Sequence, residues 1–150
     1  MTVAFPKPIH QTKAAKRLRP RNAARAAKAL EEDFGPLADA VRLLPCCVKD
    51  CNRRPTDPDH VVTRGAGGHA WIIVDGEVVG NIAPVCHAHH TGGSDIRRPR
   101  HAVGLATFEA EHTFVLRLPF ERIELPTLAA VAKRVGEWFL SEGTPEGAPA

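Results

Sequence analysis

The pattern of apolar and polar positions predicts two helices in the first third of the chain. Asn22 is a favourable helix cap, and the run AARAAKALEEDF that follows it has high helix propensity up to Gly35. Pro36 suits the first turn of a second helix, PLADAVRLL. Residues 1–20 have no sustained periodicity, so we expect them to be mostly disordered.

The centre of the chain combines a polar loop with β-branched runs. PCCVKDCNRRPTDPDH, residues 45–60, fits neither a helix nor a strand. HVVT and WIIVDGEVVGNIA predict strands, and Asp75-Gly76 in the second run is a strong signal for a two-residue hairpin turn. The glycines of RGAGG mark a flexible loop after His60, and we expect a helix to begin near Pro84.

The last third of the chain predicts a second helical region. HAVGLATFEAEH has apolar residues at rough helical spacing, VLRLPFERIEL reads as a strand or an extended connector, and LAAVAKRVGEWFL is an amphipathic helix. The tail is expected to be disordered, and no internal repeat is found. We divide the chain into a basic arm (1–20), a helical segment (21–44), a core (45–115), a C-terminal extension with its amphipathic helix (116–141) and a tail (142–150).

The composition limits the size of the core and favours a bound metal. A chain of 150 residues is about one domain, and although 43% of them are hydrophobic, only 5% are aromatic and Tyr is absent. No apolar run has the length of a signal peptide or a membrane span, so we predict a soluble cytoplasmic protein without membrane contact. In a reducing compartment, four cysteines are expected to bind metal rather than form disulfides.

The charge is unevenly distributed, although its net value is only +3. Eight basic residues precede the first acidic one, Glu31, and a second basic group follows the histidines near residue 90. Such groups have affinity for a phosphate backbone, although a solvated surface is the alternative interpretation. The candidate DNA contacts are Lys16, Arg17, Arg19, Arg97, Arg98 and Arg100.

The cysteines have the spacing of a structural zinc site. Cys86 and His89 are separated by two residues, which lets both side chains reach one tetrahedral ion from a single turn. Cys51 and either Cys46 or Cys47 would complete the set, and the spacing leaves the choice between these two cysteines open. The alternative is that these cysteines are small buried apolar residues and the histidine lies on the surface.

Other histidines and acidic residues near this site allow further assignments. His90 or His87 could replace His89 as the zinc ligand if the helix register differs. Asp57 is interpreted as a turn residue, with contact to metal as the alternative. His101 and His112 are interpreted as solvent-facing helix residues, and contact with metal or phosphate is the alternative for His101, which is close to the arginine group.

The order Asp59-His60, then Asn81, then His90, inside a zinc-ligand frame, resembles the HNH or His-Me finger nucleases. DHVVTRGAGG, PVCHAHH and HAVGLATFEAEH carry the resemblance over residues 44–115 and are similar in particular to small phage and prophage HNH proteins linked to recombination. It implies an α+β fold with a small zinc-stabilised ββα-metal core and flanking helices. Two departures are His89, where a cysteine is usual, and the wider spacing of the first cysteine pair.

The resemblance implies a metal-dependent endonuclease that hydrolyses DNA. His60 would act as the general base, Asp59 and His90 would hold a catalytic Mg²⁺ or Mn²⁺, and Asn81 would hold the loop and orient His60. DNA is the implied substrate, and recombination or phage proteins are candidate partners. Two other classes are kept: a zinc-stabilised nucleic-acid-binding module without catalysis, and a zinc-held protein-interaction domain.

Overall fold

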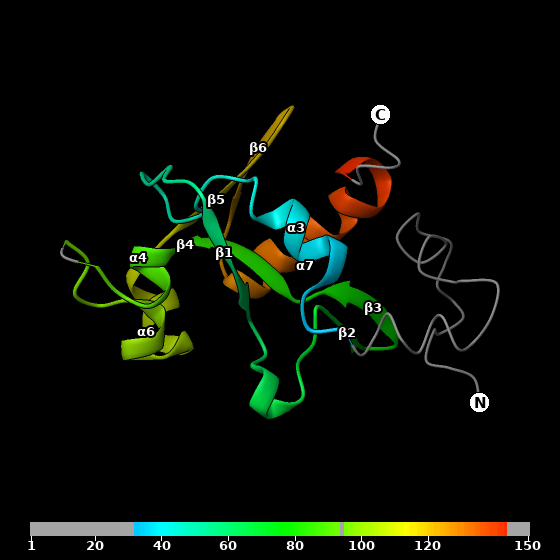
Figure 1. Cartoon of the computed structure of the whole chain (residues 1–150), viewed down its shortest axis with the longest axis horizontal. Coiled ribbons are helices and arrows are strands. Elements are labelled where there is room, and N and C mark those ends of the chain that lie inside the picture. The colour runs from blue at the N-terminus through cyan, green and yellow to red at the C-terminus, as the bar shows by residue number, and fades with distance from the viewer. Residues whose placement is uncertain (1–31, 94, 144–150) are drawn as a thin grey trace.

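Antiparallel strand pairs form the sheets of the computed structural model, which describes residues 32–93 and 95–143 (Figure 1). The fold of these residues is α+β, with three short two-stranded sheets. The pairs are β1 (Thr56–His60) with β4 (Ile82–Cys86), β2 (Trp71–Val74) with β3 (Glu77–Gly80), and β5 (Phe114–Leu118) with β6 (Glu121–Leu125). The β2–β3 hairpin is therefore inserted between the two partners of the first sheet.

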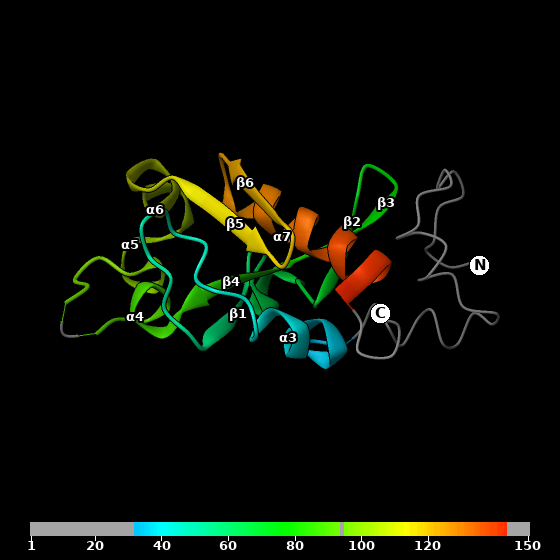
Figure 2. The same cartoon turned by 90° about the horizontal axis from the view of Figure 1, so that it is seen from above.

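Short helices surround the β1–β4 pair. Figures 1 and 2 show α4, α5 and α6 at one end of this pair, and α3 and the β2–β3 hairpin at the other. The helices are α3 (Gly35–Val41), η1 (Arg64–Ala66), α4 (His87–His90), α5 (Arg100–Val103), α6 (Leu105–Glu111), α7 (Leu128–Trp138) and η2 (Phe139–Gly143).

The core lies between β4 and the helices α3 and α7. All five residues of β4 are buried, and α7 packs its buried face against β3 and β4. Gly80 and Gly136 make this approach close, because a Cβ atom on Gly136 would lie only 2.9 Å from the Gly80 nitrogen. The Thr56 hydroxyl donates hydrogen bonds to the carbonyls of Val41 and Leu44, at 2.9 and 3.1 Å, and so ties β1 to the end of α3.

Several predicted elements are confirmed. The Asp75-Gly76 turn joins β2 to β3 with positive φ at both residues, +51° and +79°, as a type I′ turn requires. The helices predicted from Pro36 and from Leu128 are present as α3 and α7. The run at 115–125, for which a strand or a connector was expected, forms most of the β5–β6 hairpin.

Three boundaries differ from the prediction. The first strand covers residues 56–60, whereas HVVT leaves the sheet after His60. The stretch after Pro84 is still strand, because Pro84 pairs with Pro58 in the β1–β4 ladder and the helix begins only at His87. The helix expected at 101–112 is broken at Gly104, whose φ of +90° does not fit a helix.

The predictions for the N-terminal part of the chain and for membrane spans have different outcomes. The first predicted helix, except for residues 32–34, and the basic arm lie outside the described residues. Within residues 32–93 and 95–143, no helix has the length and apolar character needed to cross a membrane.

Candidate metal centres

Three cysteines and one histidine form a cluster with the geometry of a tetrahedral metal site. The donor atoms of Cys46, Cys51, Cys86 and His89 all lie within 4.8 Å of one another. The Cys51 and Cys86 sulfurs are 3.9 Å apart, and His89 Nδ1 lies 3.3 Å from the Cys86 sulfur and 3.8 Å from that of Cys46. Tetrahedral zinc requires roughly 3.8 Å between two sulfurs and roughly 3.6 Å between sulfur and nitrogen. The cluster can therefore hold a metal ion such as zinc.

Local structure brings these four residues together. Cys86 ends β4 and caps α4, and its sulfur accepts a hydrogen bond from the His89 amide at 3.5 Å. The loop before β1 supplies the other two cysteines. Arg117 on β5 holds this loop by donating to the carbonyl oxygens of Cys46 and Cys51, at 3.1 and 3.0 Å. We refer to these four residues as the cysteine cluster.

The structure distinguishes the two adjacent cysteines. Both cysteines are fully buried, but only Cys46 belongs to the cluster, whereas the backbone of Cys47 bridges two strands. The Cys47 amide donates to the Pro84 carbonyl at 2.9 Å, and its carbonyl accepts from the Val115 amide at 2.8 Å. Successive side chains of an extended backbone point in opposite directions, so only one of the pair faces the cluster.

Burial makes the thiols of this region costly to ionise. Desolvation raises the pKa of both the Cys46 and the Cys47 thiol well above the ordinary value. A bound divalent ion reverses this preference, because it deprotonates a coordinating thiol outright. The thiols of the cysteine cluster are therefore neutral without a metal and become thiolate ligands when a cation binds.

A second cluster lies on the other side of the same helical turn. One carboxylate oxygen of Asp59 and one ring nitrogen each of His90 and His101 lie within 4.8 Å of one another. The residues come from β1, α4 and α5, and the two imidazole rings meet edge to face at 4.4 Å. Asp59 is buried and His101 is exposed. We refer to these three residues as the Asp–His cluster.

Arg100 neutralises part of the charge in the Asp–His cluster. Its Nε lies 3.1 Å from Asp59 Oδ2, and its Nη2 donates to the carbonyl oxygens of His60 and Val61, at 2.9 and 3.0 Å. Arg100 is only 5% exposed, so the sequence-based assignment of this side chain to DNA contact is wrong for this structure. Its guanidinium is occupied inside the protein.

Asp59 is not fully satisfied by this ion pair. The pair is not aligned as a hydrogen bond, so among the described residues Asp59 Oδ2 and Arg100 Nε both lack a hydrogen-bond partner. Burial raises the pKa of Asp59 to about 7, although the Arg100 charge opposes the rise. A buried carboxylate next to two imidazoles is a donor set that suits a divalent cation.

Asp57 contacts the histidines of α4. It is a strand residue of β1 rather than the expected turn residue, and its Oδ2 lies 3.0 Å from His90 Nδ1 and 3.2 Å from His87 Nδ1. The contact between Asp57 and these histidines was not expected from the sequence. The available signal was the spacing of Asp57 and Asp59, because residues two apart on a strand share a face.

His60 lies outside the Asp–His cluster as defined by its donor atoms. Its Nε2 is hydrogen-bonded to the backbone carbonyl of Asp33, and the Phe34 ring meets the imidazole edge to face at 5.1 Å. Because a carbonyl only accepts, the proton must be on Nε2 and the lone pair on Nδ1. Burial lowers the pKa of His60, which favours this neutral form near neutral pH.

Asn81 holds the loop that follows β1. Its side-chain amide donates to the carbonyl oxygens of Val62 and His69, at 2.9 and 2.8 Å, and its oxygen accepts from the Val62 amide at 2.9 Å. The loop-holding role expected from the sequence agrees with these contacts. The expected bond to His60 does not occur among the described residues, because the Asn81 side chain is saturated by the loop backbone.

The remaining predicted DNA contacts are on the surface or outside the described residues. Arg98 forms a two-point ion pair with Glu111, with Nε and Nη2 at 2.9 and 2.6 Å from Oε2. Arg97 is exposed, and both arginines line an open cavity of about 610 Å³. Lys16, Arg17 and Arg19 lie outside the described residues.

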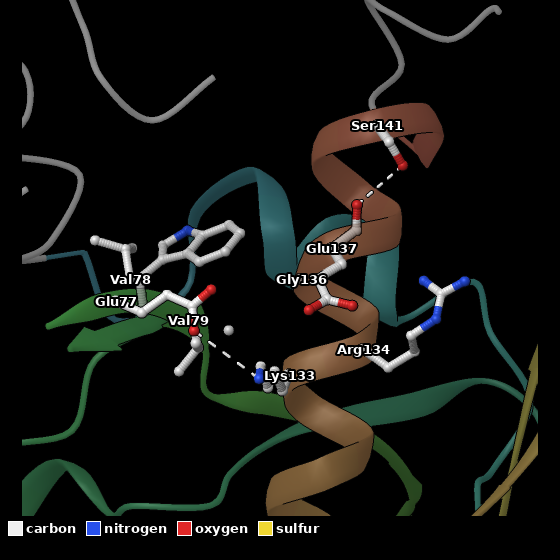
Figure 3. Close-up of a pocket in the computed structure, with 10 residues that line it drawn as sticks. Glu77, Val78, Val79, Lys133, Arg134, Gly136, Glu137 and Ser141 are labelled. Carbon is white, nitrogen blue, oxygen red and sulfur yellow. Dashed lines mark hydrogen bonds and ion pairs between the residues drawn. The ribbon is translucent and has the colours of Figure 1, made fainter. Parts of the chain in front are cut away.

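A separate cavity of about 450 Å³ lies between β3 and α7 (Figure 3). Its lining includes Glu77 and Lys133, whose charged atoms are 3.9 Å apart, and Glu137. None of the donor atoms of either metal cluster lines it. We therefore assign the candidate chemistry to the two clusters.

Comparison of the chain with known protein families, with curated proteins and with solved structures found no match. The resemblance to HNH nucleases described above consequently remains a prediction from the sequence motifs.

Proposed function

We propose that the protein is a metal-dependent endonuclease of the HNH type that hydrolyses DNA, with a structural zinc in the cysteine cluster. The observation that carries this proposal is the convergence of Asp59, His90 and His101 beside the cysteine cluster. A nucleic-acid-binding module without catalysis needs only the cysteine cluster. The Asp–His cluster has no function in such a module. Antiparallel β1 and β4 running directly into α4 are compatible with a ββα-metal core.

Each residue of the proposed site has a role that suits its surroundings. Asp59 and His90 hold the catalytic Mg²⁺ or Mn²⁺, and His101 is a third donor. Such an ion supplies positive charge to the scissile phosphate and the departing 3′ oxygen. His60 accepts a proton from water at Nδ1, because its Nε2–H is bonded to the Asp33 carbonyl.

DNA is proposed as the substrate because basic groups occur both before the core and within it. Arg97 and Arg98 follow α4, and eight basic residues precede Glu31. Contacts of this kind neutralise phosphates without reading base sequence. We therefore expect binding that weakens steeply as salt concentration rises.

A plasmid cleavage assay tests the proposal. The purified protein is incubated with supercoiled plasmid and Mg²⁺ or Mn²⁺, with and without EDTA, beside a His60→Ala variant. Nicking that requires the divalent ion and is lost in the variant is the expected result. Nicking that persists in EDTA, or that is unchanged in His60→Ala, would contradict it.

The contacts of His60 favour one alternative, a zinc-stabilised nucleic-acid-binding module. The His60 ring is covered on its edge by Phe34 and bonded to Asp33, which is also how a purely structural histidine is held. Under this alternative the protein shifts DNA in a gel at low salt, and no divalent ion produces nicks. The same assay therefore separates the two functions.

A further inference from the structure

The carboxylate of Asp57 contacts His90 on the side of the ring opposite the Asp–His cluster. Asp57 Oδ2 lies 3.0 Å from His90 Nδ1, whereas His90 Nε2 lies 3.6 Å from Asp59 Oδ1. The two ring nitrogens thus contact carboxylates of two β1 residues that are separated only by Pro58. One strand contacts both sides of the same imidazole.

We propose that Asp57 is a positioning residue that fixes His90 in the tautomer able to bind a divalent cation through Nε2. This inference rests on the proposed function, since it deepens the account of the same site. An ionised carboxylate can only accept, so a neutral His90 that is bonded to Asp57 carries its proton on Nδ1. The lone pair is then on Nε2, the nitrogen nearer the carboxylate of Asp59.

The contacts of His90 fix the orientation of its imidazole ring as well as the nitrogen that carries the proton. His90 is mostly buried, with 15% of its side chain exposed, and the His101 ring lies 4.4 Å away on the cluster side. Without Asp57, an imidazole can rotate by half a turn or move its proton to Nε2, and either change removes the lone pair from the cluster. Carboxylates bonded to a metal-binding histidine commonly act in this way.

His87 provides a matched control on the same carboxylate. Its Nδ1 lies 3.2 Å from Asp57 Oδ2, but its side chain is 74% exposed and it belongs to neither cluster. If Asp57 acted merely by anchoring α4 to β1, loss of either histidine contact would have a similar effect. If Asp57 acts through the His90 ring, loss of His87 has little effect.

The first experiment measures the tautomer without any metal at the Asp–His cluster. Long-range ¹H–¹⁵N NMR of the zinc-loaded full chain, with no Mg²⁺ or Mn²⁺ added, assigns the proton of His90 to one ring nitrogen. We expect the Nδ1–H form in wild type and in His87→Ala, and loss of that preference in Asp57→Ala. Predominance of the Nε2–H form in wild type would overturn the inference, whatever the activity of the protein.

The second experiment measures Mn²⁺ binding by calorimetry on the same zinc-loaded variants. Asp57→Ala is expected to lower the affinity for Mn²⁺ roughly 10- to 100-fold, and His87→Ala to lower it by less than about 2-fold. Asp57→Asn retains an acceptor oxygen for Nδ1–H, so we expect it to bind Mn²⁺ more tightly than Asp57→Ala. Equal affinity in Asp57→Ala and wild type would contradict the positioning role.

The two readouts separate failure of this inference from failure of the proposed function. If wild type does not bind Mn²⁺ at the Asp–His cluster, the proposed nuclease and the positioning role both fail, even with the Nδ1–H tautomer present. If wild type binds Mn²⁺ and Asp57→Ala binds equally well, only the positioning role fails.

Discussion

The cysteine cluster and the Asp–His cluster take consecutive residues of α4, yet they have different designs. His89 completes a set of four donors, three of which are sulfur, enclosed by the loop before β1 and the end of β4. His90 belongs to a set of three oxygen and nitrogen donors, one of which, His101, is exposed. The first set has the four donors of a closed structural site, whereas the second has only three donors, and we propose that an ion there would keep positions for water or substrate.

The difference shows that one short helix can contribute adjacent residues to two separate donor clusters. Adjacent residues of an α-helix are separated by about 100° around its axis, so His89 and His90 face different surroundings. The sulfur-rich side can hold a cation, because its four donor atoms lie close together. The side with oxygen and nitrogen donors contains an ion pair that leaves Asp59 Oδ2 without a hydrogen bond among the described residues. The predictions below test whether the two sides can be separated.

The largest expected effect follows loss of the cysteine cluster. Cys46→Ala should reduce the zinc content to well below one equivalent and abolish cooperative unfolding, because zinc affinity in small domains is largely folding free energy, about 10–16 kcal/mol. Cys47→Ala is the matched control, since this neighbour lies outside the cluster and should retain one zinc. Metal analysis and thermal unfolding measure both variants. Equal zinc loss in the two would mean that the cysteine assignment is wrong.

The next effect concerns activity in the Asp–His region. His60→Ala should lose roughly 10²- to 10⁴-fold in rate, as expected for a general base, and should keep its affinity for the catalytic ion. His90→Ala should lower the affinity for that ion, so a higher Mn²⁺ concentration should restore part of the activity of this variant. Cleavage rate measured against Mn²⁺ concentration decides between these roles. Rescue of His60→Ala alone would reverse the two assignments.

A smaller effect is expected from the buried ion pair. Arg100→Met should lower the free energy of unfolding by about 3 kcal/mol, because it leaves the buried Asp59 carboxylate unpaired and removes two hydrogen bonds to carbonyls. The zinc content should not change, which would separate the two clusters. Arg98→Met, which breaks an exposed pair with Glu111, should stay close to wild type in urea unfolding. Equal destabilisation of both variants would contradict the larger stabilising effect expected of the buried Arg100 pair.

The smallest effect is a dependence on pH. Burial raises the folded-state pKa of Asp59 to about 7, above the ordinary value of 3.8, so the folded state binds a proton that the unfolded state releases. The stability contributed by this group is therefore present at low pH and is lost as pH rises towards 7. Zinc-loaded wild type without Mg²⁺ or Mn²⁺ should lose stability on the order of 2 kcal/mol more than Asp59→Asn between pH 5 and pH 8. If the free energy of urea unfolding depended on pH in the same way in both proteins, the pKa of Asp59 would not be elevated.

Local signals in the sequence predicted much of the fold. The Asp75-Gly76 turn and the amphipathic run from Leu128 depend on turn chemistry and helical periodicity, and both elements are present. The region around Pro84 could not be assigned in this way. Its strand depends on pairing with β1 across more than 20 residues of sequence, and a short apolar run with proline does not reveal its partner.

The candidate site was partly accessible from sequence for a similar reason. Spacing alone identified Cys86 and His89 as neighbours, because both lie within one turn. Spacing could not choose between Cys46 and Cys47, since the choice depends on which side of an extended segment faces α4. Arg100 was assigned to the surface from its neighbours in sequence, and only the packing of α5 against β1 explains its burial.

Asn81 fixes the loop that joins β1 to β2 at a point next to the base of the β2–β3 hairpin. The buried Asn81 side chain bonds the backbone at Val62 and His69, so the base of the β2–β3 hairpin, next to Asn81, is held in place. The far end, Asp75-Gly76, is exposed and has open space beside the glycine. A peptide tag or a small reporter domain could be inserted at this tip, away from the residues that Asn81 holds, without moving either metal cluster.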